Sequence, residues 1–295
     1  MLLLSLLCLV PAADLALKDG DRVVMVGGAL IEREQLFGRV EVMLHTSFPD
    51  KKFTVRNVGW SGDTVWGEAR AEFGPQPEGY KKLVEQVKVE KPTVLILAYG
   101  TNEAFAGKEK VEKFTEQYRK LLADIVPEGC RTVFLTIPGP KHPKLSPKFA
   151  QIEYDAAIKA LAKERQGIVV DIYHAFHPYD SRPMSDDGML PNDLGYEKLA
   201  TDIAFAIHAE EREQARKQPQ VITPVPLNKP VDLEPLRQLI LQKNQLYFYK
   251  YRPANDTYLY LFRKHEQGNN AAEIPKFDPL IAELDAKINE LKKQK

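Results

Sequence analysis

The sequence has few cysteines and no excess of charge of either sign. Its two cysteines, Cys8 and Cys130, are too few for a disulfide framework, so a hydrophobic core must hold the fold. Lys and Arg number 41, and so do Asp and Glu, which gives no electrostatic basis for binding nucleic acid or an anionic membrane. The six histidines and Cys130 lack the spacing of metal ligands, so we expect neither a metal nor another cofactor.

Long apolar runs are also missing, except at the N-terminus. Residues 1–10 are mostly apolar and residues 11–13 are small, which is typical of a secretory signal peptide, although the usual positive charge is absent. The run is too short to cross a bilayer. We therefore expect residues 1–13 to be removed and the protein to be exported to the periplasm or the cell exterior, without a membrane anchor. The alternative is a frayed apolar terminus behind an upstream start codon.

Five short runs of apolar and β-branched residues predict strands. Each run is nearly continuous rather than alternating, as in strands that are buried on both faces. The runs are Val23–Val26, Phe53–Val58, Thr93–Ala98, Thr132–Ile137 and Ile168–Ile172.

Helical spacing separates these runs, and Asn192 is the expected N-cap of the last helix that follows them. This alternation predicts an α/β fold, a three-layer, doubly wound, five-stranded parallel sheet with helices on both faces. In such sheets ligands bind beyond the carboxyl ends of the strands, so the residues directly after each strand are the functional candidates. One predicted helix contains Gly38 and buries Leu36, Phe37, Val40, Met43 and Leu44, and another buries Ile152, Ala156, Ile158 and Leu161.

The composition changes near residue 218. Four prolines between residues 219 and 230 mark an extended linker, and an aromatic cluster at Tyr247–Phe262 precedes a charged helix at Pro279–Lys295. We assign residues 14–218 to the α/β domain and residues 219–295 to a Pro-rich linker and a helical, aromatic C-terminal extension. The aromatic cluster either packs the extension onto the domain or forms a platform for a sugar or a protein partner.

Polar and glycine-rich blocks follow the predicted strands. The first strand is followed by Gly27-Gly28-Ala29-Leu30 and the second by Asn57-Val58-Gly59-Trp60-Ser61-Gly62-Asp63-Thr64. The third is followed by Tyr99-Gly100-Thr101-Asn102-Glu103, and Asp187-Gly188-Met189-Leu190-Pro191-Asn192 precedes the last helix of the domain. In this order the blocks resemble those of the SGNH (GDSL-type) hydrolase family, over about residues 20–210. The resemblance implies a flavodoxin-like sheet and an esterase site.

The resemblance also assigns roles to individual residues. The family's first block ends in the nucleophilic serine, where this chain has Ala29. The second block gives a glycine N–H to the oxyanion hole and matches Gly59, and the third gives an asparagine amide and matches Asn102. The last block is Asp-x-x-His-Pro, in which Asp187 matches the aspartate and Leu190 replaces the catalytic histidine.

These departures remove the groups that perform ester chemistry. Acyl transfer needs a nucleophile, a base and donors for the oxyanion. Ala29 has no nucleophilic atom, Leu190 cannot accept a proton, and an aspartate orients an imidazole without replacing it. The N–H groups of Ala29 and Gly59 and the Asn102 amide would remain as an oxyanion hole. We therefore predict a non-catalytic protein that binds an ester- or glycan-like small molecule.

Other interpretations remain open. An active ester hydrolase, such as a carbohydrate deacetylase or a lipase, could use a rearranged triad of Ser61, His177 and Asp187. Each of these residues also has a purely structural interpretation. Ser61 could be a turn hydroxyl, Asp187 a turn carboxylate and His177 a loop residue with local hydrogen bonds. Asn102 could be a buried amide that joins two strands, and Asp63 could cap a helix. A third hypothesis is an interaction protein that binds a partner through its C-terminal extension.

Overall fold

The computed structural model describes residues 17–142, 144–173, 182–208, 232–266, 268 and 270–293. The predicted signal peptide, the predicted Pro-rich linker and His177 lie outside the described residues.

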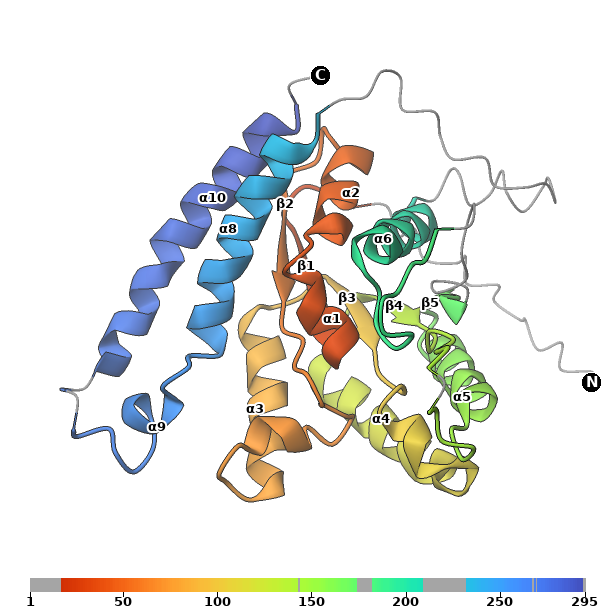
Figure 1. Cartoon of the computed structure of the whole chain (residues 1–295). Helices are drawn as coiled ribbons and strands as arrows, with labels where there is room; N and C mark the ends of the chain where they lie inside the picture. The colour runs from red at the N-terminus through yellow and green to blue at the C-terminus, as the bar shows by residue number, and fades with distance from the viewer. Residues whose placement is uncertain are drawn as a thin grey trace, which may run out of the picture.

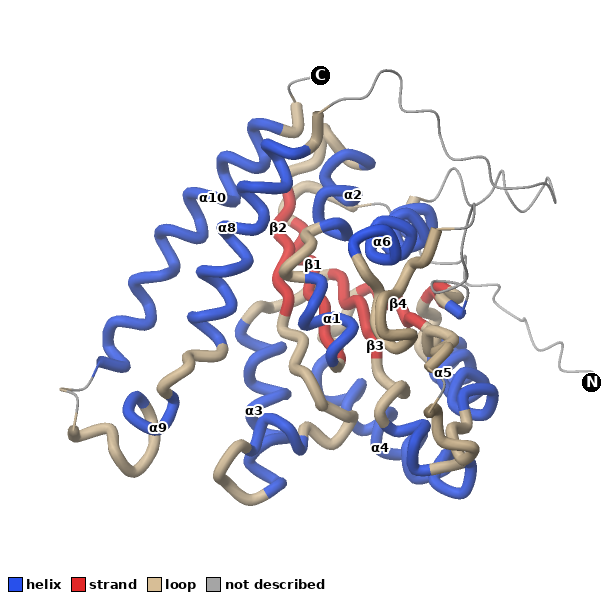
Figure 2. The backbone as a smooth tube through the Cα atoms, in the orientation of Figure 1, coloured by secondary structure: helices blue, strands red, loops and turns tan. Residues whose placement is uncertain are grey.

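A parallel sheet of five strands forms the centre of the molecule and confirms the predicted α/β class. The strand order is β2-β1-β3-β4-β5, which is the order of flavodoxin-like sheets. Figure 2 shows the strands enclosed by helices. The strands are β1 (Asp21–Gly27), β2 (Phe53–Asn57), β3 (Val94–Ala98), β4 (Arg131–Leu135) and β5 (Ile168–Val170).

Helices cover both faces of the sheet, as predicted, and give three layers (Figure 1). Alternate residues of β1 point to opposite faces, so that Val23 and Met25 join one hydrophobic cluster while Val24 and Val26 join the other. The first face carries α1 (Ala29–Glu34), α2 (Arg39–Ser47) and α6 (Asp193–Ile207), and the second carries α3 (Gln76–Val89), α4 (Val111–Ile125) and α5 (Gln151–Glu164). Short 3-10 turns lie at η1 (Glu68–Ala71), η2 (Glu103–Ala106) and η3 (Lys108–Lys110).

The starts of two helices test the sequence-based expectations. The prediction of one continuous helix through Gly38 is wrong, because Gly38 has a φ of 66° and is the N-cap of α2. A Cβ at Gly38 would lie 3.1 Å from Cγ2 of Ile240, so the glycine also leaves room for the C-terminal segment. Leu36 lies in the break and is 67% exposed. Asn192 is the N-cap of α6, as predicted, and its Oδ1 accepts a hydrogen bond from the N–H of Gly195.

The buried face of α5 also differs from the prediction. Ile152 is 83% exposed and Ala156 is exposed as well. Ile158 and Leu161 are fully buried, as predicted, and Tyr154 joins them in the core in place of Ile152 and Ala156. Helical spacing allows either choice, and the large ring of Tyr154 buries more apolar surface.

The C-terminal segment forms a helical hairpin along one edge of the sheet (Figure 1). Asn289 pairs with the backbone of Phe53 on β2, because its Oδ1 accepts from the N–H at 3.4 Å and its Nδ2 donates to the C=O at 3.1 Å. The hairpin therefore covers the open edge strand. None of the described helices is long and apolar enough to cross a membrane. The segment comprises α8 (Glu234–Tyr251), α9 (Asp256–Leu259), η5 (Asn270–Lys276) and α10 (Phe277–Leu291).

Buried polar contacts fasten this hairpin to the domain. Lys243 on α8 donates to Glu41 on α2 at 2.7 Å, and both side chains are 1% exposed. Tyr247 is buried and its hydroxyl donates to Glu90 at 2.8 Å. Part of the aromatic cluster thus packs the extension onto the domain, whereas Phe262 at its end is 73% exposed.

Candidate functional site

The strand order reverses between β1 and β3, and a pocket lies beyond their carboxyl ends. Such a switch point is where open α/β sheets bind their ligands. The pocket has a volume of about 140 Å³, which suits a short acyl group better than a whole sugar. Its lining residues are Gly28, Ala29, Leu30, Asp63, Ala98, Tyr99, Gly100, Thr101, Asn102, Glu103, Phe105, Pro138, Met189 and Leu190.

The pocket brings together Ala29, Asn102 and Leu190, which come from three distant parts of the chain. Ala29 begins α1 directly after β1, and Asn102 precedes η2 after β3. A Cβ on Gly28 would lie 3.2 Å from Nδ2 of Asn102, so the glycine lets the amide approach the turn before Ala29. The residues at the expected nucleophile and base positions therefore share one cavity with the expected oxyanion donor.

The Asn102 amide is tied to the loop after β2. Its Nδ2 donates to the carbonyl of Asp63 at 2.7 Å. An amide nitrogen carries two N–H bonds, so this contact leaves one of them for a ligand. Asn102 thus has the structural role of joining two loops, and this role is compatible with ligand binding.

Gly59 is not among the described residues that line the pocket with Asn102. Its N–H donates to Oδ1 of Asn57 at 2.9 Å, within its own loop. A Cβ on Gly59 would lie 2.3 Å from the backbone nitrogen of Glu32. The glycine is required by the close approach of this loop to α1.

Asp187 holds the turn that places Leu190. Its Oδ1 accepts hydrogen bonds from the N–H groups of Met189 and Leu190, both at 2.8 Å, and from the Ser185 hydroxyl at 3.2 Å. Partial burial raises the pKa of Asp187, but these hydrogen bonds outweigh it and leave the pKa below its usual value. The carboxylate therefore stays ionised and organises the backbone, which matches the turn alternative.

Ser61 points to a carboxylate rather than into the pocket. Its hydroxyl donates to Oε1 of Glu32 at 2.7 Å and its N–H donates to Oε2 at 2.9 Å. Ser61 is not among the residues that line the pocket. His177, its expected partner in a rearranged triad, lies outside the described residues.

A buried ion pair that the sequence did not reveal lies beneath the pocket. Arg70 donates from Nε to Oδ2 of Asp63 at 2.7 Å, and both side chains are fully buried. The Tyr99 hydroxyl donates to the same oxygen at 3.2 Å, and burial raises the pKa of Asp63 despite the arginine. The expectation that Asp63 caps a helix is therefore wrong. A charge pair between a loop and a 3-10 turn has no periodic signal in sequence.

Glu103 is a second buried acid beside the pocket. Its two carboxylate oxygens accept hydrogen bonds from the N–H groups of Val65 and Gly100, each at 2.9 Å. Burial raises the pKa of Glu103 to about 7, although these hydrogen bonds oppose the shift. No Lys, Arg or His is among the described residues that line the pocket, so its charged groups are acidic. No described lining side chain offers a cationic partner to an anion, so the pocket is better suited to an uncharged group.

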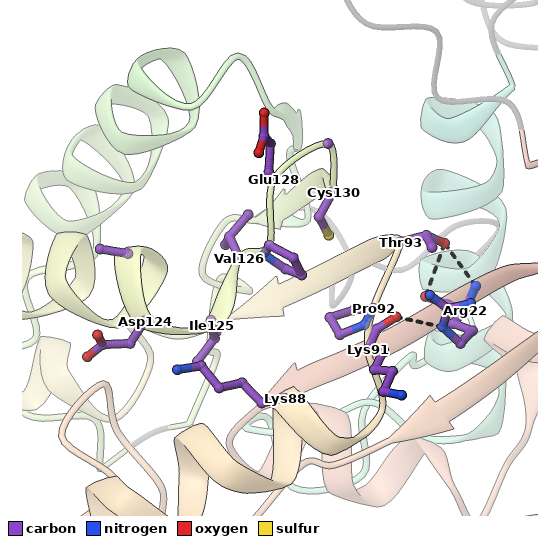
Figure 3. A pocket seen from close by; sticks show the side chains of 13 residues that line it. Arg22, Lys88, Lys91, Pro92, Thr93, Asp124, Ile125, Val126, Glu128 and Cys130 are labelled. Atoms are coloured by element: carbon purple, nitrogen blue, oxygen red, sulfur yellow. Dashed lines mark hydrogen bonds between the residues drawn. The ribbon is translucent and has the colours of Figure 1, made fainter.

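A larger cavity of about 560 Å³ lies at the opposite, amino-terminal edge of the sheet (Figure 3). Arg22 at the start of β1 is fixed there by Thr93 and by the carbonyl of Lys91, which accepts from its Nε at 2.6 Å. None of the predicted site residues lines this cavity. Among the described residues there is also no His, Cys, Asp and Glu group arranged to hold a metal.

Comparison with known proteins agrees with this architecture. Residues 34–198, more than half of the chain, match the GDSL-like lipase/acylhydrolase family. The chain therefore belongs to this family. Ala29 lies just before the matched segment. No curated protein matches the sequence.

Solved structures of an acetylxylan esterase from Geobacillus stearothermophilus are similar in fold. The esterase itself has a TM-score of 0.50 and 19% identity, over 64% of this chain and 95% of that one. A catalytic mutant with serine changed to alanine has a TM-score of 0.51 and 19% identity, over 65% and 96% of the two chains. A catalytic mutant with histidine changed to alanine has a TM-score of 0.52 and 18% identity, over 65% and 95%.

Proposed function

We propose that this protein is a non-catalytic member of its family, which binds an uncharged ester- or glycan-like ligand without hydrolysing it. The observation that carries the proposal is the lining of the pocket at the switch point. Ala29 and Leu190 stand there beside Asn102, and no Ser or His is among its described lining residues. Without the serine and the histidine of the triad, the remaining donors would supply at most the roughly 10³–10⁴-fold acceleration of a hydrolase without its triad.

The chemistry of the pocket supports an uncharged acyl group as the part of the ligand that enters it. Phe105, Pro138 and Met189 give the cavity an apolar wall, and Asn102 provides one directed polar group. Both oxygens of Glu103 and Oδ2 of Asp63 accept buried hydrogen bonds, while Oδ1 of Asp63 is buried without one. An ester or amide carbonyl is matched by the free amide N–H, whereas a carboxylate product would find no cationic partner among the described lining residues.

The solved relatives offer an independent parallel. In the acetylxylan esterase, the changes of a serine and of a histidine to alanine are each described as catalytic mutations. This chain carries alanine and leucine at the positions that the family blocks assign to those residue types. Acetylated sugars are therefore the first ligands to test.

Restoring the missing groups tests the proposal. We expect the full chain to release no acetate from acetylated xylo-oligosaccharides or short acyl esters above the buffer rate, while the combined Ala29→Ser and Leu190→His variant gains turnover. Each single change is the matched control, because a triad with one member missing loses most of its activity. Turnover by the unaltered chain that Ser61→Ala abolishes would instead establish the rearranged hydrolase.

Export is a separate part of the proposal and rests on residues 1–13 alone. Expression of the full chain in a bacterial host, followed by mass determination of the accumulated protein, tests it. We expect a periplasmic or extracellular product that begins at Asp14. A cytoplasmic product that retains Met1 would contradict export.

A further inference from the structure

The last turn of α8 and the residue after it reach the loop that follows β2. The Tyr251 hydroxyl donates to the carbonyl of Gly59 at 2.6 Å. Arg252 forms an ion pair with Glu32, and its guanidinium lies 4.1 Å from the ring centroid of Trp60. Trp60 is 2% exposed, so this cation–π contact is largely shielded from water.

These contacts hold the loop at residues 58–63, here named the β2 loop, from outside. Glu32, the partner of Arg252, also accepts hydrogen bonds from the N–H and the hydroxyl of Ser61. Asp63 ends the β2 loop, and its carbonyl accepts the hydrogen bond from Nδ2 of Asn102 at 2.7 Å. The chain of contacts therefore runs from the extension to the one directed polar group of the pocket.

A second chain of contacts reaches the same loop from inside. The Tyr251 carbonyl accepts from Nε2 of Gln86 at 3.0 Å, and Oε1 of Gln86 accepts from the Arg70 guanidinium. Arg70 pairs with the Asp63 carboxylate and also donates to the carbonyl of Val58 at 2.9 Å. Both ends of the β2 loop are thus bonded to a buried arginine that Gln86 connects to the hairpin.

We propose that Tyr251 and Arg252 are positioning residues of the pocket, so that the C-terminal extension is part of the binding site rather than an attached module. The inference rests on the proposed function in that it takes the switch-point pocket as the ligand site. Earlier in α8, Lys243 contacts α2 and β2, and Tyr247 contacts the end of α3. The two functions of the hairpin, docking and positioning, therefore reside in different residues and can be separated.

The test compares variants at two pairs of neighbouring residues in the full chain. Arg252→Gln removes the cation that contacts the β2 loop, and its control Lys250→Gln removes a cation whose partner is Asp278 on α10. Tyr251→Phe removes only a hydroxyl, and its control is Tyr249→Phe, at a ring that is 45% exposed. The readout is the NMR resonance pair of the Asn102 side-chain amide, assigned by its loss in Asn102→Ala, with melting temperatures recorded in parallel.

We expect the Asn102 amide resonances to shift or broaden in Arg252→Gln and Tyr251→Phe and to keep their positions in both controls. Unchanged resonances in the two test variants, or equal shifts in the controls, would overturn the proposal. If Arg252→Gln does not fold, the smaller Tyr251→Phe change decides alone. This readout requires no turnover, so it stands even if the restored Ala29→Ser and Leu190→His variant stays inactive and the proposed function fails.

Where the restored variant is active, kinetics give a second readout. Adding Tyr251→Phe to it should lower kcat about tenfold or more and leave KM within about twofold, since a displaced oxyanion donor is felt mainly in the transition state. Adding Tyr249→Phe should change neither. An unchanged kcat with Tyr251→Phe would contradict the positioning role.

Discussion

Glu34 on α1 is a buried acid with an incomplete set of partners. Its Oε1 accepts the N–H of Val40 at 2.6 Å, while Oε2 is buried without a hydrogen bond. Burial raises the pKa of Glu34 from 4.5 to about 8, and the nearby Glu41 adds to the shift. The carboxyl group is therefore largely protonated at neutral pH.

Glu34 predicts a decrease of stability with rising pH. The native state holds a proton that the unfolded chain releases between pH 4.5 and about 8, so the free energy of unfolding falls by about 1.4 kcal/mol per pH unit in this window. Glu34→Gln keeps an acceptor for Val40 and cannot ionise. Urea unfolding of both proteins across this window should show the variant gaining relative to the parent as pH rises. A difference that does not change with pH would refute the assigned pKa.

Some residues of the site were predictable and others were not. Asn102 and Ala29 follow buried strands directly, so the parallel sheet brings them to one edge whatever the loops do. Gly59 lies equally close to the end of its strand, β2, but its direction is set by Asn57 and Glu32, contacts that no local pattern reveals. The pairing of Asp63 with Arg70 was missed for the same reason.

At the scale of elements, the attachment of α8 to α2 depends on a buried ion pair. Lys243 donates to both oxygens of Glu41 and to the carbonyl of Val55. Removing one partner of such a pair leaves the other charge uncompensated in the interior, which costs more than the pair itself contributes.

Lys243→Met should therefore lower the free energy of unfolding by about 3–5 kcal/mol. Lys250→Met on the same helix is the control, because its partner Asp278 is largely exposed, and it should change the free energy by less than about 1 kcal/mol. Chemical denaturation measures both. Equal effects of the two changes would mean that the buried pair does not fasten the hairpin.

The strands were predictable because continuous apolar runs have few alternative structures, and their parallel arrangement followed from the alternation with helices. The break before α2 was not, because the apolar spacing continues across Gly38 while its backbone is left-handed. On α5, Ile158 and Leu161 were predicted correctly, but choosing Tyr154 over Ile152 required knowing which side the sheet occupies.

At the scale of the whole molecule, the extension packs along the α/β domain that contains the pocket. The domain supplies the cavity through the ends of β1 and β3, and the hairpin covers the edge strand and contacts the β2 loop. This arrangement could not be predicted from sequence, because it depends on ion pairs and hydrogen bonds between residues about two hundred positions apart.

The central claim is that the pocket binds an acylated ligand and does not cleave it. One NMR titration of the full chain with an acetylated xylo-oligosaccharide reports on both parts, because the Asn102 amide senses binding and free acetate senses hydrolysis in the same sample. The account predicts a saturable shift of the Asn102 resonances with no acetate beyond the buffer rate. Acetate released at an enzymatic rate, or an amide that no acylated ligand shifts, would contradict it.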